Sequence, residues 1–176
     1  MIKKTMTEKT MTKNALFAAS LAGTMLVLSA AASAQTAPVF EKKNYNYSEW
    51  AKGRFSEAVT VTSSGPTKMI FLAGVGAEEE NGKPGDIRAK DDFIAQCKYA
   101  YDKIKRALEK NGAGFGDIVK IVSYVTDMRF QADYGKCRSE VFGTTPPPAH
   151  TLLNIVQLAW PGMMVEVDVT AMVPVK

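Results

Sequence analysis

Residues Thr144 to Val169 read TTPPPAHTLLNIVQLAWPGMMVEVDV, and this stretch decides the architecture that we expect. Pro146 to Pro148 hold the backbone extended and exclude a helix at this point. Two β-type runs follow, Leu152 to Leu158 and Met163 to Val169, with Trp160-Pro161-Gly162 as a turn between them. The pattern predicts a β-hairpin at the end of the domain.

Two titratable side chains of this stretch are candidate site residues. His150, the only histidine of the chain, directly follows the proline run, and Glu166 lies in the second β-type run. A hairpin can bring these groups towards one cleft, where an imidazole and a carboxylate can exchange protons with a substrate. We therefore expect His150 and Glu166 to face one shared cleft. The alternatives are a histidine bonded to a backbone carbonyl and a carboxylate that faces solvent.

The elements before this stretch alternate between β-type and helical patterns. We expect strands at 58–62, 68–73 (central) and 117–126, and helices from Asp86 or a nearby capping residue to Lys110 and from 130 to 142. Apolar residues recur at three- and four-residue spacing in the first helix, which predicts one buried face: Phe93, Cys97, Ala100, Tyr101, Ile104 and Leu108. The order predicts an α+β fold, in which one mixed sheet carries two helices on one face. Association between subunits is the natural cover for the other face.

The first 34 residues have the pattern of a secretory signal peptide. Four lysines precede an apolar run from Ala15 to Ala30, and Ala32-Ser33-Ala34 offers the small residues that signal peptidase cleaves after. The alternative is an uncleaved anchor, for which about 16 apolar residues are short against the ~20 that span a bilayer. We expect cleavage after Ala34, a start at Met1 or Met11, and a periplasmic or secreted protein. Residues 35–52 then form an irregular polar arm, and 53–176 form the domain.

The charge balance argues against a nucleic-acid partner. The whole chain has 22 basic and 18 acidic residues, a net charge of +4, but the first 34 residues hold four lysines and one glutamate. The remaining 18 basic and 17 acidic residues give the mature part a net charge of +1. Nucleic-acid binding needs a basic surface, so we expect no nucleic-acid partner and, after cleavage, no membrane association.

The cysteine and histidine counts restrict the metal and disulfide chemistry. Cys97 and Cys137 each lie in a predicted helix; we expect two separate buried thiols, with a bridge between neighbouring helices as the alternative. One histidine and no CxxC pair leave no zinc-ligand spacing, so we expect no metal site.

Several short motifs, taken in this order and spacing, resemble the RidA/YjgF/UK114 family, the reactive intermediate deaminases. The similarity covers about 120 residues, from Gly53 to Val173. It consists of GRFSEAV (53–59), IFLAGVG (70–76), Gln96, FGDIVKIVSYVTDM (115–128), PPPAHT (146–151) and VEVDVTA (165–171). The resemblance implies a chorismate-mutase-like fold and a homotrimer with ligand clefts between subunits. It also implies hydrolysis of enamines and imines to a keto acid and ammonia, with no cofactor.

Carried over by position, the resemblance makes Glu166 the glutamate that orients the attacking water. His150 stands where deaminase members have an arginine that binds the substrate carboxylate. Losing that bidentate, permanently charged contact could cost ~2–3 kcal/mol of substrate binding, so we expect an altered substrate. His150 would then act as a general acid or base or as a weak anion contact. The other expected substrate-binding residues are Phe55, Ala73, Gly74, Thr151 and Leu152.

The leading hypothesis is an exported Rid-like hydrolase or deaminase acting on a small imine, enamine or related compound between subunits. The alternative is a non-catalytic trimer that binds a small ligand or a partner protein. Ribonuclease action, known for some relatives, is the least favoured because the mature charge is near neutral. The arginines expected on helices are interpreted as solvated, with Arg129 as the one that could replace the missing clamp: Arg88, Arg106, Arg129 and Arg138.

Overall fold

The structure is a computed structural model that describes residues 39–175. The predicted signal peptide with its cleavage site, the first residues of the predicted arm, and Lys176 lie outside the described residues.

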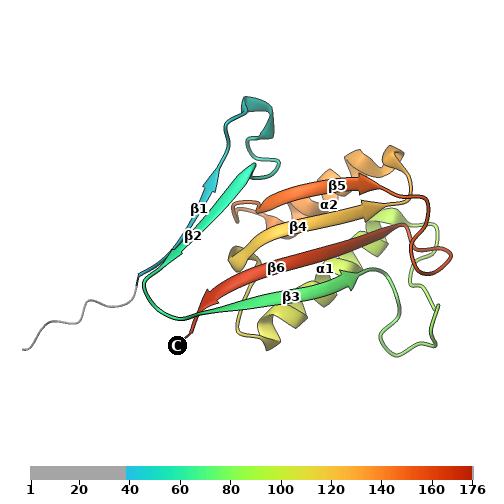
Figure 1. The fold of residues 1–176 in the computed structure, drawn as a ribbon. Helices are drawn as coiled ribbons and strands as arrows, with labels where there is room; N and C mark the ends of the chain where they lie inside the picture. The colour runs from blue at the N-terminus through green and yellow to red at the C-terminus, as the bar shows by residue number, and fades with distance from the viewer. Residues whose placement is uncertain (1–38, 176) are drawn as a thin grey trace, which may run out of the picture. The chain divides into compact units, whose positions relative to one another are not determined.

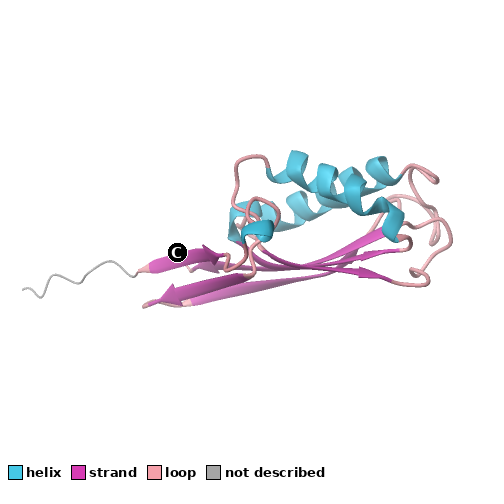
Figure 2. Ribbon diagram, turned by 90° about the horizontal axis from the view of Figure 1, so that it is seen from above, coloured by secondary structure: helices cyan, strands magenta, loops and turns pink. Residues whose placement is uncertain are grey.

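The domain consists of a four-stranded sheet with two helices packed on one face (Figures 1 and 2). The strands are β3 (Thr67–Val75), β4 (Ile118–Val125), β5 (Ala149–Asn154) and β6 (Val165–Pro174), and the helices are α1 (Phe93–Lys110) and α2 (Gln131–Phe142). The spatial order is β3-β6-β4-β5, with β4 and β5 parallel and the other pairs antiparallel. The predicted α+β class, a mixed sheet with two helices on one face, is confirmed.

The prediction of a terminal β-hairpin around the Trp160-Pro161-Gly162 turn is wrong. β5 pairs with β4 in parallel through the α2 crossover and forms an edge of the sheet, while β6 lies between β3 and β4. Strand β4 therefore separates β5 from β6, and residues 155–164 form a connection between them. The prediction failed because local turn chemistry does not show which strand a β-type run will pair with.

The expected position of the 68–73 strand and the expected helix cap also need correction. The strand exists as β3, but it is an edge strand, paired only with β6 within the four-stranded sheet. Helix α1 is capped by Asp92, whose carboxylate accepts a hydrogen bond from the Ala95 amide at 2.9 Å. Asp86 instead accepts one from the Lys83 amide, so it belongs to the turn before the helix.

The polar arm is more regular than expected. β1 (Phe40–Tyr45) pairs antiparallel with β2 (Ala58–Ser63) in a separate two-stranded sheet, visible in blue and cyan in Figure 1. The chain between these strands includes a short 3₁₀ turn at Glu49–Ala51. Asn44 and Ser56 both donate to the Pro147 carbonyl, at 3.1 and 2.6 Å, so the proline run is held against this hairpin.

The core between the helices and the sheet follows the predicted periodicity. All six predicted apolar residues of α1 are buried, as are the alternate β6 residues Val165, Val167 and Val169. Two further 3₁₀ turns, Phe115–Asp117 and Met128–Phe130, precede β4 and α2. Gln96 is fully buried, and its amide group bonds to the Gly162 carbonyl at 2.8 Å and the Met164 amide at 2.9 Å, which ties α1 to the start of β6.

Cys97 and Cys137 form a disulfide between α1 and α2. Our expectation of two separate thiols was wrong, because the two helices pack side by side and bring the two Cα atoms to 6.5 Å. That separation is within the range of a disulfide. The bridge fixes α2 against α1 on the covered face of the sheet.

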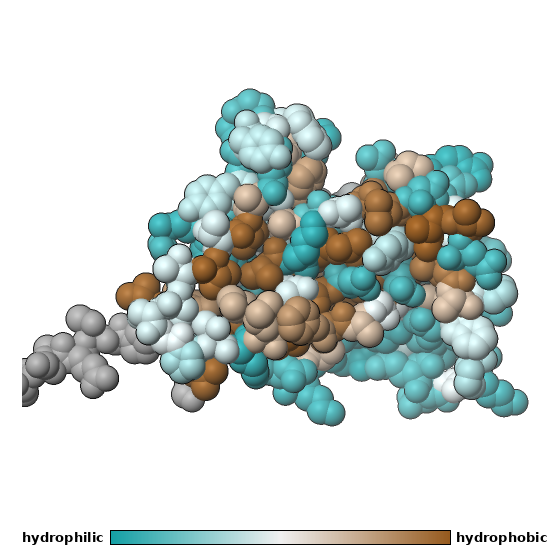
Figure 3. All heavy atoms as spheres, in the orientation of Figure 1, coloured by the Kyte–Doolittle hydropathy of each residue, from teal (hydrophilic) through white to brown (hydrophobic). Residues whose placement is uncertain are grey.

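The other face of the sheet is open in the single chain and is turned to the viewer in Figure 3. Hydrophobic and weakly polar side chains gather over the strands there, and Met69, Phe71 and Leu153 are among the exposed apolar residues. Within residues 39–175, no helix is both long and apolar enough to cross a bilayer.

Candidate functional site

His150 is half-buried beneath α2, on the covered face of the sheet. Strand β5 begins directly after Pro146 to Pro148, and the β4–β5 register places His150 opposite Ile121. The imidazole stacks on the Tyr134 ring at a centroid distance of 5.7 Å and meets the Phe55 ring at 6.3 Å. Burial, together with the positive charges of Arg138 and Lys120, lowers the pKa of His150 to about 3. The side chain is therefore neutral at pH 7.

The hydrogen bonds of His150 define its tautomer. Nδ1 lies 3.3 Å from Nη1 of Arg138, and because a guanidinium only donates, Nδ1 accepts. Nε2 then carries the proton and donates to Ser123 Oγ at 3.2 Å. Ser123 in turn bonds to the Tyr134 hydroxyl, which lies 2.8 Å from the Tyr101 hydroxyl. The imidazole is thus one member of a buried chain of polar groups and does not end in solvent.

A cavity of about 730 Å³ opens beside this chain. Its walls come from the segment around the first 3₁₀ turn, from α2 and from β5, and include Phe55, Leu152, His150 and Arg138. Phe55 and Leu152 were both predicted to bind substrate, and the structure brings them together with His150. Thr151, predicted with them, faces the opposite side of the sheet, where its hydroxyl accepts a hydrogen bond from Lys120 at 2.7 Å.

Glu166 lies on the open face of the sheet. In the β6 register it is opposite Tyr124, between the inward-facing Val165 and Val167. Burial, followed by the negative charges of Glu78 and Asp168, raises the pKa of Glu166 above its ordinary value. Its carboxylate forms no hydrogen bond or ion pair with the side chains of residues 39–175. Asp168, two residues on, accepts a hydrogen bond from the Tyr124 hydroxyl at 3.1 Å.

Gly74 is the close neighbour of Glu166. It lies in the irregular part of the β3–β6 pairing, between Leu72 and Val75, with the predicted Ala73 exposed beside it. A Cβ atom added at Gly74 would collide with the Glu166 carboxyl group, whose Cδ would be only 2.6 Å away. The predicted residues Ala73, Gly74 and Glu166 are therefore brought together, but not with His150.

The prediction that His150 and Glu166 face one shared cleft is wrong for a single chain, because the two side chains lie on opposite faces of the sheet. On β4 the buried Ile121, Ser123 and Val125 face the helices, and the register places His150 on that same side. Glu166 is paired with Tyr124, whose position alternates with theirs, so it faces the other way. Strand β4 also separates β5 from β6.

Arg138 is the residue that our sequence interpretation missed. It is only 7% exposed and lines the cavity, whereas a solvated side chain was expected. Arg129, the expected substitute clamp, is 88% exposed at its side chain and pairs with Asp127. The available signal was spacing: Arg138 falls midway between Tyr134 and Phe142 at four-residue intervals, which is the buried stripe of α2.

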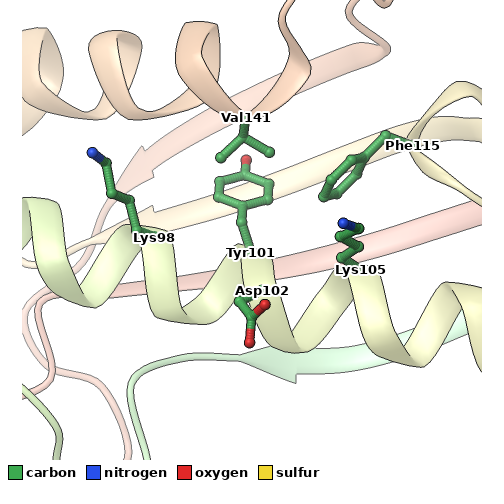
Figure 4. A pocket seen from close by; sticks show the side chains of 6 residues that line it. All are labelled: Lys98, Tyr101, Asp102, Lys105, Phe115 and Val141. Carbon is green, nitrogen blue, oxygen red and sulfur yellow. The ribbon is translucent and has the colours of Figure 1, made fainter.

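A smaller hollow of about 340 Å³ lies where α1 and α2 approach Phe115 (Figure 4). Its three charged residues are paired with neighbours: Lys98 with Glu140 at 2.7 Å, Asp102 with Arg106 at 3.1 Å, and Lys105 with Glu109 at 3.9 Å. It therefore offers no free group for chemistry. Among residues 39–175, no three histidine, cysteine or carboxylate side chains gather as a metal site.

Comparison with known proteins identifies the family. Residues 47–173 match the family described as "Endoribonuclease L-PSP". The chain is 30% identical to the RutC family protein YjgH of Escherichia coli over 129 residues, which cover 73% of this chain and 89% of that protein.

Solved structures agree with this match. A conserved Rid-family protein of Yersinia pestis, YyfB, superposes with a TM-score of 0.65 at 23% identity, covering 75% of this chain and 98% of that one. The structure of protein YJGH superposes with a TM-score of 0.54 at 28% identity, covering 75% and 93%. The predicted fold is confirmed by these neighbours, and the chain belongs to the RidA/YjgF/UK114 family.

Proposed function

We propose that this protein is a Rid-family small-molecule hydrolase that deaminates imines, enamines or related compounds in a cleft completed by a second copy of the chain. The single observation that carries this proposal is the environment of Glu166. Its carboxyl group lies against Gly74 on the open face, has no partner among residues 39–175, and has a raised pKa. A raised pKa moves a carboxyl group towards the pH at which it can both take up and return a proton.

In the proposed reaction, water adds to the imine carbon while the Glu166 carboxylate accepts a proton from that water. Glu166 passes this proton to the imine nitrogen, which gives a carbinolamine. The carbinolamine hydroxyl then gives up its proton to the same carboxylate, which returns it to the amine as the C–N bond breaks, so that a keto compound and ammonia are released. His150 does not act as the acid, because its pKa of about 3 leaves no imidazolium at neutral pH. Its role is to hold the cavity wall through Ser123 and Arg138.

The proposed cleft needs a second copy of the chain, because the cavity and Glu166 lie on opposite faces of one sheet. The open face carries exposed apolar residues, Met69, Phe71 and Leu153, that association would bury. We propose a homotrimer, in which each cavity meets the Glu166 surface of a neighbour. Light scattering of the mature chain tests this, with three chain masses expected and one chain mass contradicting it.

The experiment on function incubates residues 35–176 with 2-aminoacrylate generated in the assay and measures ammonia and pyruvate release. Glu166→Gln should lower turnover at least ~100-fold, the scale of general acid–base catalysis. Asp168→Asn is the matched control, because it removes a carboxylate from the same face and the same strand. Equal turnover by Glu166→Gln and the parent would contradict the proposed mechanism.

One observation favours a second candidate function, a non-catalytic ligand-binding protein. The cavity is formed within a single chain, and its histidine is held neutral. This alternative predicts that a ligand raises the melting temperature equally in the parent and in Glu166→Gln, and that no substrate is turned over.

We also propose export to the periplasm or the medium, supported by the Cys97–Cys137 disulfide, since such bonds persist in oxidising compartments. Cell fractionation and N-terminal sequencing test it: the mature chain should begin at Gln35. A small molecule is preferred over RNA because the mature part has a net charge of only +1.

A further inference from the structure

Arg138 carries a charge that residues 39–175 leave without a partner of opposite sign. Its side chain is almost fully buried, yet it takes part in no ion pair with the carboxylates of those residues. Nε and Nη2 are shielded from water and have no hydrogen-bond partner there. A buried guanidinium with two unused donors is costly unless something else satisfies it.

The cavity that Arg138 lines is suited to an anion. Its wall residues include two arginines, Arg54 and Arg138, and neither an aspartate nor a glutamate. The remaining wall combines aromatic and aliphatic residues, Trp50, Phe55 and Phe142 among them, with polar residues such as Gln131 and Thr145. The combination of positive charge and apolar surface fits a small organic acid better than it fits a cation or a sugar.

The donors that remain free have the geometry of a carboxylate contact. Nη1 is already engaged, through bonds of 3.3 Å to both the Arg54 carbonyl and His150 Nδ1. Nε and Nη2 form one edge of the planar guanidinium, the edge that binds two carboxylate oxygens in parallel. Both atoms are shielded from water in this arrangement, so the guanidinium must turn into the cavity to reach a ligand. That turn breaks the two long bonds of Nη1 and moves the guanidinium away from the Tyr134 and Phe142 rings, whose centroids lie 5.8 Å from its central carbon.

We propose that Arg138 binds the carboxylate of a small organic acid in this cavity, with the apolar wall holding the remainder of the ligand. A guanidinium on α2 thus does the work for which His150, on β5, is unsuited. The inference rests on the proposed function, because it names the class of ligand that binds in the same cavity. It concerns binding only and does not require turnover.

The test is calorimetric titration of the mature chain with benzoate and pyruvate, and with benzamide as the uncharged shape control. Both acids should bind, and benzamide should bind at least ~10-fold more weakly. Arg138→Met should lower the affinity for benzoate roughly ten- to a hundredfold, the scale of a charged hydrogen-bond pair. Arg138→Lys keeps the charge but loses the two parallel donors of the guanidinium, so it should recover only part of the affinity for benzoate. Arg129→Met is the matched control, because Arg129 is exposed and lies outside the cavity.

A second readout uses the parent protein, so it does not depend on how well Arg138→Met folds. His150 is the only histidine, so its Cε1–H signal in the proton spectrum of the untagged chain is unambiguous. Benzoate should shift this signal in the parent and in Arg129→Met, since Nδ1 of His150 contacts Arg138. Benzoate affinity that is equal in the parent and in a folded Arg138→Met variant overturns the proposal, and so does a signal that benzoate leaves unmoved.

Failure of this inference and failure of the proposed function give different results. Turnover of 2-aminoacrylate with unchanged kinetics in Arg138→Met would remove Arg138 from the ligand site and leave the hydrolase. Benzoate binding that requires Arg138 in a protein with no turnover would keep the anion site and remove the hydrolase.

Discussion

The cavity beside His150 and the surface around Glu166 use the two faces of one sheet in opposite ways. In the cavity, the titratable groups are enclosed by α2 and bonded to one another, from Arg138 through His150 and Ser123 to Tyr134. Around Glu166, the carboxylate lies on the open face without a partner among residues 39–175, and burial and like charges raise its pKa.

In the proposed reaction, this difference separates ligand binding from proton transfer. A cavity lined by two arginines can hold an acidic ligand, but its neutral imidazole has little tendency to take up a proton. An unpartnered carboxyl group can exchange protons with water, but the open face does not enclose a substrate. Each prediction below perturbs one of these regions and compares the response of the other.

The largest effect on stability is expected from the disulfide. The double substitution Cys97→Ala, Cys137→Ala removes a bridge between residues 40 positions apart and should lower the free energy of unfolding by about 2–4 kcal/mol. Because the bridge holds α2, which carries Arg138, benzoate affinity should fall as well. Urea unfolding and calorimetry measure the two effects. The parent protein in reductant should behave like the double variant, and equal stability of parent and variant would contradict the prediction.

A large effect on turnover is expected from Gly74→Ala. The new Cβ atom would collide with the Glu166 carboxyl group and displace it, and misplacing a catalytic group by about 1 Å can cost ~100-fold in rate. Benzoate affinity should not change, because the cavity lies on the other face. Gly116→Ala is the control, since a Cβ atom there meets nothing within 4 Å. Normal turnover in Gly74→Ala would show that the position of Glu166 is unimportant.

A moderate effect is expected from acid. The pKa of His150 is 6.5 in an unfolded chain and about 3 in the fold. Between these values the unfolded chain binds the proton and the folded chain does not, so stability falls with decreasing pH, by at most about 1.4 kcal/mol per unit. Unfolding of His150→Gln, measured from pH 7 to pH 4, should show a shallower loss than the parent. Parallel pH curves for the variant and the parent would show that the imidazole of His150 is not held neutral in the fold.

Glu166 should contribute to the same pH curve with the opposite sign. Its pKa in the folded protein is raised, so the folded state holds this proton more tightly than the unfolded chain does. The contribution to stability is present below the unfolded pKa and is lost as the pH rises through the folded value. The difference in unfolding free energy between Glu166→Gln and the parent should therefore change in favour of the variant as the pH rises from 4 to 7.

The smallest effect is expected from Asp168→Asn. The charge of Asp168 is the last of the three causes that raise the pKa of Glu166, after burial and Glu78. Removing it should move the acid limb of the pH–rate profile slightly to lower pH while the plateau rate stays the same. A shift to higher pH would mean that the charge of Asp168 does not act on Glu166.

Much of the fold could be predicted from local patterns. The buried face of α1 follows from apolar residues at three- and four-residue spacing, and all six residues predicted for that face are buried. The family motifs assigned Phe55, His150 and Leu152 to one site, and these three residues do line the same cavity. These results depend on short-range periodicity or on the match of a motif to a known family.

The site could be predicted only in part, because strand pairing is not a local property. The turn at Trp160-Pro161-Gly162 suggested that β5 and β6 are neighbours, but a run of β-type residues does not specify its partner. Once β4 lies between them, alternation sends His150 and Glu166 to opposite faces. Arg138 was missed for a related reason, since a charged residue on a helix is usually solvated unless a third element covers it.

The sequence by itself determined the family, the fold class and the buried face of α1. These are properties of residue type and spacing along the chain. Only the tertiary structure decided that Cys97 and Cys137 are joined, that His150 is neutral, and that Arg138 supplies a buried guanidinium beside it. Those properties depend on distances across the fold, because burial and neighbouring charge set the state of a side chain only after distant segments have packed together.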